Sequence, residues 1–272
     1  LIVLFSEKFR LTNLVLSTTS GLALLALLIL IVDILLFDLD VLKIKDKIVN
    51  KIPKTIVSSI ISIVIVFLVV SMFYGISFFS SKITETFNIL IKAFATDRWV
   101  RTVAENNQPY ITDWIGSFGK TFFWMFLFGS ILLFYNMIKS LRKKYVLLVM
   151  VTYILFLFGF TFSRYSSSSN FNGVNPLSIT IYIGSLILFI LFLALTYIYS
   201  FYKDKELFEE ILKFDKVYTF VFVWFFIMVI GARSAVRLLF IFSPITAILS
   251  AYLVFKIVEE FKKYFKTNYY RI

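Results

Sequence analysis

Seven long apolar runs, each close to the length of a membrane-crossing helix, constrain this sequence more than any other feature. A helix needs about 20 apolar residues to cross about 30 Å of hydrocarbon. Backbone polar groups in lipid must be satisfied within the segment, so helices are expected for these runs. The chain is 60% hydrophobic and 16% charged, and the charges gather between the runs. The sequence therefore predicts an all-α, multi-pass transmembrane bundle.

The 272 residues are assigned to one transmembrane domain with about seven spans. These are Leu14–Phe37, Thr55–Phe79, Thr121–Ile138, Tyr145–Ser163, Leu177–Phe201, Val217–Ala232 and Val236–Val258. One straight helix through the last two spans would be roughly twice as long as the bilayer core is thick. We therefore expect a hairpin that turns near Arg233. The start at Leu1, inside an apolar stretch, indicates a piece of a longer protein.

The basic residues predict the orientation. If the loops after the first, third and fifth spans and the C-terminal tail are cytoplasmic, 18 Lys and Arg lie inside and 10 outside. The positive-inside rule favours this arrangement, with the N-terminus outside. The net charge of +12 is then explained by topology and by contact with anionic membrane lipids, and no nucleic-acid partner is expected.

In this orientation the longest external loop is Ser80–Lys120. Apolar residues at helical spacing in its first half predict a helix on the membrane surface: Ile83, Phe87, Leu90 and Phe94. Its second half, Thr96–Trp114, breaks this period, and we expect an irregular segment of the kind that carries binding residues. The other external loop, Arg164–Pro176, is interpreted as a flexible polar connector.

The absence of Cys and His excludes several kinds of chemistry within the chain. These are disulfide bonds, thiolate or imidazole zinc sites, His-ligated haem and Ser-His-Asp catalysis. Any metal must be held by oxygen, which points to Mg²⁺, Mn²⁺ or Ca²⁺. In the predicted topology the external carboxylates are Glu7, Glu85, Asp97, Glu105 and Asp113.

Two motifs carry a resemblance to a known family. The first is Thr102–Glu105 (TVAE), followed by Gln108-Pro109 and then Trp114. The second is Val236–Pro244, in which Arg237 begins a membrane helix and Pro244 follows. Together they resemble the catalytic subunit of oligosaccharyltransferases, in which a Thr/Ser-x-x-Glu motif lies in a long external loop and a later helix begins with Arg. Four spans between Glu105 and Arg237 make the archaeal branch the best match.

The resemblance implies a fragment of a GT-C-type membrane domain that acts on the external face of an archaeal plasma membrane. The full-length enzyme would transfer an oligosaccharide from a polyprenyl carrier, such as dolichol phosphate or pyrophosphate, to Asn in an Asn-x-Ser/Thr acceptor polypeptide. Inversion at the anomeric carbon, without a covalent enzyme intermediate, is implied. The earlier N-terminal helices and the C-terminal soluble domain of the family are missing, so we expect the 272-residue piece to be inactive alone.

The resemblance also assigns roles to residues. Glu105, in the motif that Thr102 begins, would bind Mn²⁺ or Mg²⁺ and help to hold the acceptor amide, and Arg237 would bind the carrier phosphate. Arg233 precedes Arg237 by four residues and would share its face if one helix continued through both. An Arg fork suits phosphate recognition. For Arg233 we nevertheless favour a side chain that extends to the membrane surface. Asp33, near the end of the first span, is expected to reach the interface.

Two other classes of protein remain as alternatives. One is a secondary transporter or channel that uses intramembrane charges and broken helices. Asp33 is the one plausible intramembrane acid for it, and the sequence has no evident inverted repeat. The other is a non-catalytic membrane subunit.

Overall fold

The computed structural model describes residues 18–39, 41, 52–91 and 107–269. Helices make up most of this described part, in which one isolated β-bridge occurs and no strand. Seven of its helices are long and apolar enough to cross a membrane. The all-α, multi-pass architecture predicted from the apolar runs is therefore confirmed. The contacts divide the chain into two compact units, Leu1–Asn88 and Ile89–Ile272, each of which is described by itself.

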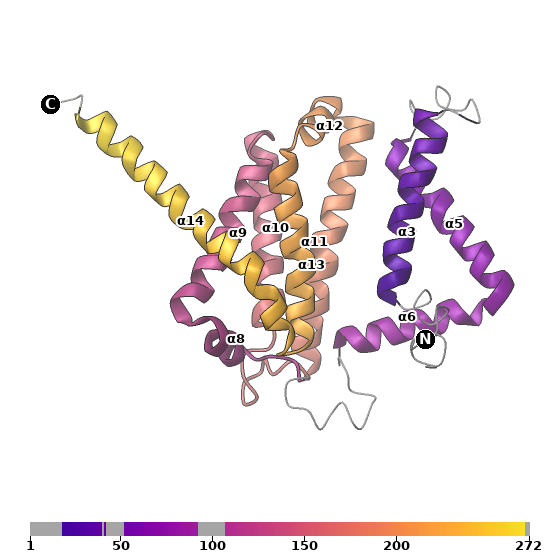
Figure 1. Cartoon of the computed structure of the whole chain (residues 1–272), viewed down its shortest axis with the longest axis horizontal. Coiled ribbons are helices and arrows are strands. Elements are labelled where there is room, and N and C mark those ends of the chain that lie inside the picture. Colours follow the sequence, from indigo (N-terminus) through magenta and orange to yellow (C-terminus); the bar gives the residue numbers. More distant parts are fainter. Residues whose placement is uncertain (1–17, 40, 42–51, 92–106, 270–272) are drawn as a thin grey trace, which may run out of the picture. The chain divides into compact units, whose positions relative to one another are not determined.

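The described part of the first unit is built around two membrane helices. Its elements are α3 (Thr18–Asp33), the π-helical turn η2 (Ile34–Asp38), α5 (Lys54–Tyr74) and most of α6 (Ser77–Ile91) (Figure 1). α3 packs against α5, and the buried apolar cluster of this unit comprises Val32 of α3, Leu36 and Phe37 of η2, and Val57 of α5. Most other apolar side chains of α3 and α5 are exposed in the isolated chain, as expected for helices that face lipid.

Asp33 is paired within this unit. Its carboxylate lies 3.3 Å from Lys54 Nζ and accepts a hydrogen bond of 2.9 Å from Ser58 Oγ. Both partners belong to the first turns of α5. The Asp33 side chain is 21% exposed, and a carboxylate at this depth costs less when a cation and a hydroxyl neutralise it.

The second span ends earlier than predicted. We expected it to continue to Phe79, but α5 stops at Tyr74 because Gly75 adopts φ +77°, a conformation outside the helical region. α6 then begins at Ser77, and its exposed face carries the Lys82–Glu85 ion pair at 2.7 Å. The predicted helix in the first half of the external loop is confirmed up to Ile91, and Phe94 lies outside the described residues.

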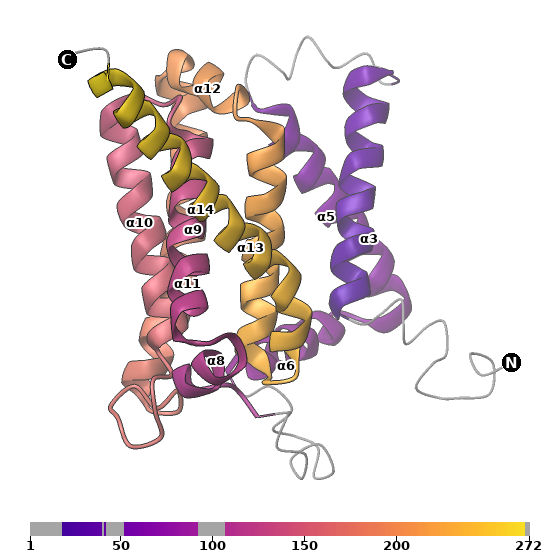
Figure 2. The same ribbon diagram turned by 60° about the vertical axis from the view of Figure 1, so that its left-hand side comes forward.

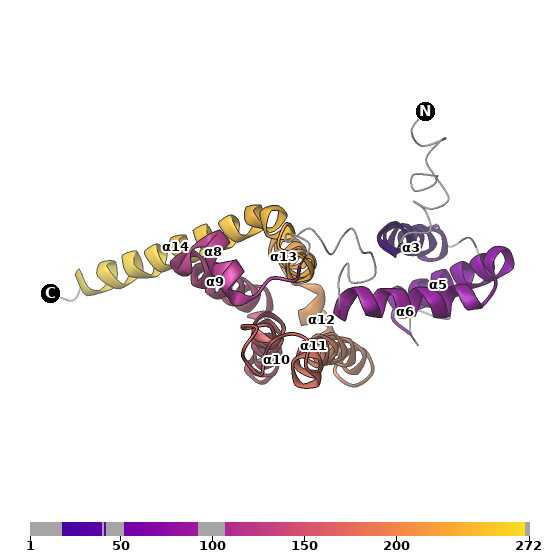
Figure 3. The ribbon, with the colours of Figure 1, turned by 90° about the horizontal axis from the view of Figure 1, so that it is seen from below.

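In its described residues, the second unit contains five membrane helices and two short ones. They are α8 (Ile111–Phe118), α9 (Lys120–Ile138), α10 (Lys143–Phe162), α11 (Pro176–Lys203), α12 (Lys205–Leu212), α13 (Lys216–Ser234) and α14 (Leu238–Tyr269). α9, α10, α11 and α13 run side by side, and α14 crosses α9 and α13 obliquely (Figure 2). Seen along the bundle, α10 pairs with α11 on the side away from α14 (Figure 3).

Small residues allow two of the helix pairs to approach closely. A Cβ placed on Gly129 of α9 would lie 2.2 Å from the main-chain oxygen of Leu249 in α14. A Cβ on Gly159 of α10 would lie 2.9 Å from the Ser185 side chain in α11. Helices in lipid associate through close packing of this kind, because lipid provides no hydrophobic force between them.

Aromatic rings fill the centre of the second unit. Phe134 stacks on Tyr153 at 4.2 Å between ring centroids, and Phe156 stacks on Phe189 at 5.1 Å. Phe222 of α13 lies 4.7 Å from Phe134. The phenylalanines of this region therefore act as packing bulk, and each ring pair adds about 0.5–1.5 kcal/mol beyond area burial.

The short helix α8 corrects the expected irregular loop. We expected no regular structure up to Trp114, but a helix begins at Ile111. The Asp113 carboxylate accepts the main-chain N–H of Tyr110 at 2.7 Å and so caps the first turn. Trp114 is 1% exposed and packs edge-on against Phe242 of α14 at 5.6 Å. Tertiary packing of this indole stabilises a helix too short to be detected by its period.

At the opposite end of the unit, α12 is fixed by charged groups. Asp204 caps it by accepting the Leu207 N–H at 3.1 Å and also forms an ion pair with Arg142, which precedes α10. Hydrogen bonding to Arg142 holds the pKa of the Asp204 carboxyl below its ordinary value. In the predicted topology this end faces the cytoplasm.

The predicted hairpin between the last two spans is confirmed. α13 ends at Ser234, Ala235 is extended with φ −156° and ψ 143°, and α14 begins at Leu238. Because the helix does not continue, the condition under which Arg233 and Arg237 would share a helical face is not met. Arg233 is buried and Arg237 is exposed.

Candidate functional site

Two of the four predicted site residues lie in the described part of the chain. Arg233 ends α13, and Arg237 immediately precedes α14. Thr102 and Glu105 lie outside the described residues, which resume at Asn107. The site is therefore built from the two arginines, from Asn107 and Gln108, and from the side chains around them.

Arg233 is buried, with 2% of its surface exposed. Its Nη1 donates to Gln108 Oε1 and its Nη2 to Ser163 Oγ, each at 3.4 Å. The guanidinium lies over the Tyr182 ring, 4.8 Å from the centroid, in a cation–π contact. The expectation that Arg233 extends to the membrane surface is thus wrong. The side chain points into the corner between α10, α11 and α13, where the amide, hydroxyl and ring receive it.

The partners of Arg233 are neutral. Among the residues that the structure describes, no carboxylate lies within ion-pair distance of its guanidinium, and its Nε has no hydrogen-bond partner. A buried cation usually has an anion close by, since desolvation without one is costly. The corner therefore has a positive potential that favours an anion nearby.

A second arginine approaches the same segment from the loop after α10. Arg164 Nε donates to the main-chain carbonyl of Gln108 at 3.0 Å, and its Nη1 donates to the carbonyl of Asn172 at 3.2 Å. Its guanidinium stacks over the Tyr110 ring at 4.1 Å. Burial lowers the pKa of Arg164 from its ordinary value, although the group remains a cation at neutral pH. Gln108 is thus contacted by two arginines, through its side chain and its main chain.

The loop that carries Arg164 is organised by hydrogen bonds. Arg164 and Asn172 form a β-bridge, and Asn172 Oδ1 accepts the N–H groups of Val174 and Asn175 at 2.9 Å. Gly173 has φ +78°, and a Cβ there would lie 2.8 Å from the Arg164 side chain. The interpretation of this loop as a simple polar connector missed its role as the support of Arg164.

The two motifs of the sequence meet in this region. The N–H of Val236, next to Arg237, donates to the main-chain carbonyl of Asn107 at 2.9 Å. The Arg233–Gln108 contact joins residues 125 positions apart in the chain. The segment that follows Thr102–Glu105 is therefore attached directly to the corner that bears Arg237.

The described carboxylates do not form a metal site. In the second unit Asp113 caps α8, and in the first unit Glu85 is paired with Lys82. No group of three or more carboxylates that could hold a metal ion occurs among the described residues. A metal in the second unit would therefore need ligands from outside the described residues.

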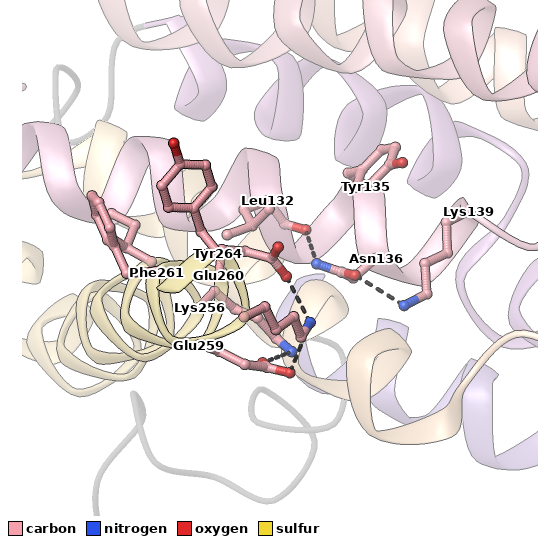
Figure 4. Close-up of a pocket in the computed structure, with 11 residues that line it drawn as sticks. Leu132, Tyr135, Asn136, Lys139, Lys256, Glu259, Glu260, Phe261 and Tyr264 are labelled. Atoms are coloured by element: carbon pink, nitrogen blue, oxygen red, sulfur yellow. Dashed lines mark hydrogen bonds and ion pairs between the residues drawn. The ribbon is translucent and has the colours of Figure 1, made fainter. Parts of the chain in front are cut away.

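One cavity lies in the site region, and another lies at the opposite end of the bundle. An apolar pocket of about 360 Å³ lies beside Ser163 and is lined by Phe158, Phe162, Tyr165, Phe171 and Ile181. A groove of about 940 Å³ lies between α9 and the last turns of α14, at the end away from Arg233 (Figure 4). Its lysines are largely engaged, since Lys256 pairs with Glu259, and Lys263 with Glu259 and Glu260.

Sequence reasoning did not single out Arg164, Ser163 or Tyr182. The sequence did contain a signal for Arg164, because an arginine directly after a membrane span usually pairs with a carboxylate or a main-chain carbonyl. Tyr182 carried no comparable signal, since its role depends on the contact of its ring with Arg233, a residue of another helix. No family model, curated protein or solved structure matches the chain.

Proposed function

We propose that this chain is the later transmembrane part of an archaeal-type oligosaccharyltransferase catalytic subunit. The full-length enzyme transfers an oligosaccharide from a polyprenyl phosphate or pyrophosphate carrier to Asn of an Asn-x-Ser/Thr acceptor polypeptide. The site is on the external face of the plasma membrane. The remaining ligands of the site come from parts of the protein that precede this sequence, so the piece is inactive alone.

The observation that carries this proposal is the bond between Val236 N–H and the Asn107 carbonyl at 2.9 Å. The proposal requires Glu105 and Arg237 to act on the same substrate, although they are far apart in the chain. Asn107 follows Glu105 by two residues and Val236 precedes Arg237 by one. Two residues of extended chain span at most about 7 Å, so this bond limits how far Glu105 can lie from the α13–α14 corner.

The chemistry of the transfer assigns a task to each group. An amide nitrogen is a poor nucleophile, and Glu105, within the motif begun by Thr102, holds the acceptor amide. The leaving carrier phosphate gains negative charge, which Arg237 stabilises as a bidentate donor. Arg233 is buried, and it adds positive potential to the site without reaching the surface. Bound Mn²⁺ or Mg²⁺, with Glu105 as its ligand from this chain, would supply further positive charge near the phosphate.

The rival functions receive less support. A transporter would need an intramembrane acid free to bind a solute or proton, whereas Asp33 is paired with Lys54 and Ser58. A non-catalytic subunit would have no need to bring the two motifs together, as the hydrogen bond between Val236 and Asn107 does. Neither rival explains why a buried arginine faces the segment that follows Glu105.

The test is Glu105→Gln in the full-length protein, assayed for transfer of glycan from a lipid-linked oligosaccharide to an Asn-x-Thr peptide. Gln keeps the size and one acceptor oxygen but removes the charge. We expect the rate to fall by about 10² to 10³, the usual cost of one strong electrostatic contact in a transition state. Partial recovery at higher Mn²⁺ would follow if ligation is the main defect.

The matched control is Glu85→Gln. Glu85 lies on an exposed helix face and pairs with Lys82 at 2.7 Å, a contact of small energetic value. We expect transfer by this variant to remain near the wild-type rate. Wild-type transfer by Glu105→Gln, or equal damage in both variants, would remove the main support for the proposal.

A further inference from the structure

Gln108 is the point at which the external segment is attached to the second unit. Its side-chain oxygen accepts from Arg233, its main-chain carbonyl accepts from Arg164, and it is only 9% exposed. Hydrogen bonds on either side of it fix the neighbouring backbone. The Asn107 carbonyl accepts from Val236 N–H, and Ile111 N–H donates to the Arg164 carbonyl at 3.2 Å.

We propose that Arg164 and Arg233 are positioning residues that clamp Gln108 and thereby fix the point from which the chain reaches Glu105. The clamp stands on the described contacts alone. Its consequence for catalysis rests on the function proposed above. Neither arginine touches substrate in this proposal, and the phosphate contact belongs to Arg237.

The geometry explains why arginine is needed at position 233. Its planar fork reaches an amide oxygen on one side and the Ser163 hydroxyl on the other, while its face stacks on Tyr182. A lysine ammonium keeps the charge but has no planar fork and no stacking face. Burying a cation among neutral partners costs stability, so a stabilising effect of the charge does not account for an arginine at this position.

The clamp limits the position of Glu105 through the short length of chain between Glu105 and Gln108. Glu105 precedes Gln108 by three residues, which span at most about 11 Å when fully extended. Misplacement of a reacting group by about 1 Å can cost about 10²-fold in rate, so loss of the clamp is expected to lower the rate of transfer. Donor binding, in contrast, depends on Arg237 in the α13–α14 corner and should be largely preserved.

The experiment uses the full-length protein in membranes and two readouts. Hydrogen–deuterium exchange reports the Val236 amide, and steady-state kinetics separate kcat from the KM values of donor and acceptor. The variants are Gln108→Leu, which removes the amide, and Arg233→Lys. Gln108→Glu restores a side-chain acceptor for Arg233, while the main-chain carbonyl that Arg164 contacts is present in every variant. The control is Ser234→Ala, next to Arg233, whose hydroxyl donates within its own helix.

We expect Gln108→Leu and Arg233→Lys to exchange the Val236 amide about tenfold faster, the factor expected for loss of one hydrogen bond to a charged group. The kcat should fall by roughly tenfold to a hundredfold and the acceptor KM should rise, while the donor KM stays within about twofold. Gln108→Glu should keep the exchange protection and most of kcat. Ser234→Ala should match wild type in both readouts.

Each contrary result has one meaning. Unchanged exchange in Gln108→Leu would overturn the clamp by Arg233, because this variant removes the side-chain acceptor and keeps the main-chain carbonyl that Arg164 contacts. Faster exchange with wild-type kcat would show that the clamp holds the loop but positions nothing needed for transfer. If Arg233→Lys does not accumulate, Gln108→Leu tests the same contact from the loop side. If the wild-type enzyme transfers no glycan, the proposed function fails and the catalytic part of this inference falls with it, while the exchange data still decide the clamp.

Discussion

The contact between α9 and α14 can be tested at Gly129. This glycine faces the main chain of Leu249, and an added Cβ would lie 2.2 Å from the Leu249 oxygen and 2.8 Å from its carbonyl carbon. Ordinary contact begins at 3.4 Å, so the oxygen would have to move by 1.2 Å, the difference between 3.4 and 2.2 Å. The atoms in the way belong to a helix backbone, which cannot rotate aside as a flexible side chain could.

Two opposing effects set the magnitude of Gly129→Ala. Alanine in a helix interior is favoured over glycine by about 1 kcal/mol. Overpacking of a close contact costs about 1–3 kcal/mol, and the upper part of this range applies where backbone must move. We therefore expect a net loss of about 1–2 kcal/mol in the free energy of unfolding. At about 2–4 °C for each kcal/mol, the apparent Tm should fall by roughly 2–8 °C.

The assay is thermal unfolding of the purified protein in detergent, followed by fluorescence or by loss of soluble monomer. The matched controls are Gly184→Ala in α11 and Gly231→Ala in α13, where an added Cβ meets nothing within 4 Å. These two substitutions increase helix propensity in the same way as Gly129→Ala, but they introduce no steric clash. We expect their apparent Tm to stay equal or to rise slightly.

A Gly129→Ala protein as stable as the controls would refute the reasoning. It would mean that α14 lies farther from α9 than the structure places it, or that α14 shifts at little cost. Either result would also weaken the placement of Arg237, because α14 begins directly after this residue.

Three further predictions concern topology, the carrier phosphate and the ion pair at the other end of the bundle. In this Cys-free chain, Asn107→Cys should react with an impermeant maleimide added outside intact cells and Lys143→Cys should not; the reverse pattern would overturn the site assignment. In the full-length enzyme Arg237→Lys should reduce transfer and Arg237→Ala should reduce it more, because Lys keeps the charge but loses the fork; equal activity of Arg237→Ala and wild type would remove this residue from the site. Because hydrogen bonding to Arg142 lowers the pKa of Asp204, its stabilisation is present above the ordinary carboxyl pKa and is lost as the pH falls through the lowered value. Asp204→Asn should therefore lower the apparent Tm at pH 7, with a difference that shrinks in acid; a difference independent of pH would contradict the ion pair.

The membrane helices could be predicted from the sequence because hydropathy and length are local properties. Each of the seven predicted spans corresponds to a helix, and the break after Arg233 was predicted because no single helix of that length fits a bilayer. The errors fell where local signals are weak. Gly75 ended a helix inside an apolar run, and α8 formed in a segment too short to show a period.

The candidate site shows the same division. The sequence identified Arg233 and Arg237 by type and position, and it placed Gln108 next to the Thr102–Glu105 motif. Only the tertiary structure decided that Arg233 is buried against Gln108 and Tyr182, and that Arg164 joins it from a different loop. Hydropathy records how each segment partitions between water and lipid, whereas these contacts depend on which helices pair and how closely they pack. That information is spread over residues far apart in the chain, so no local pattern contains it.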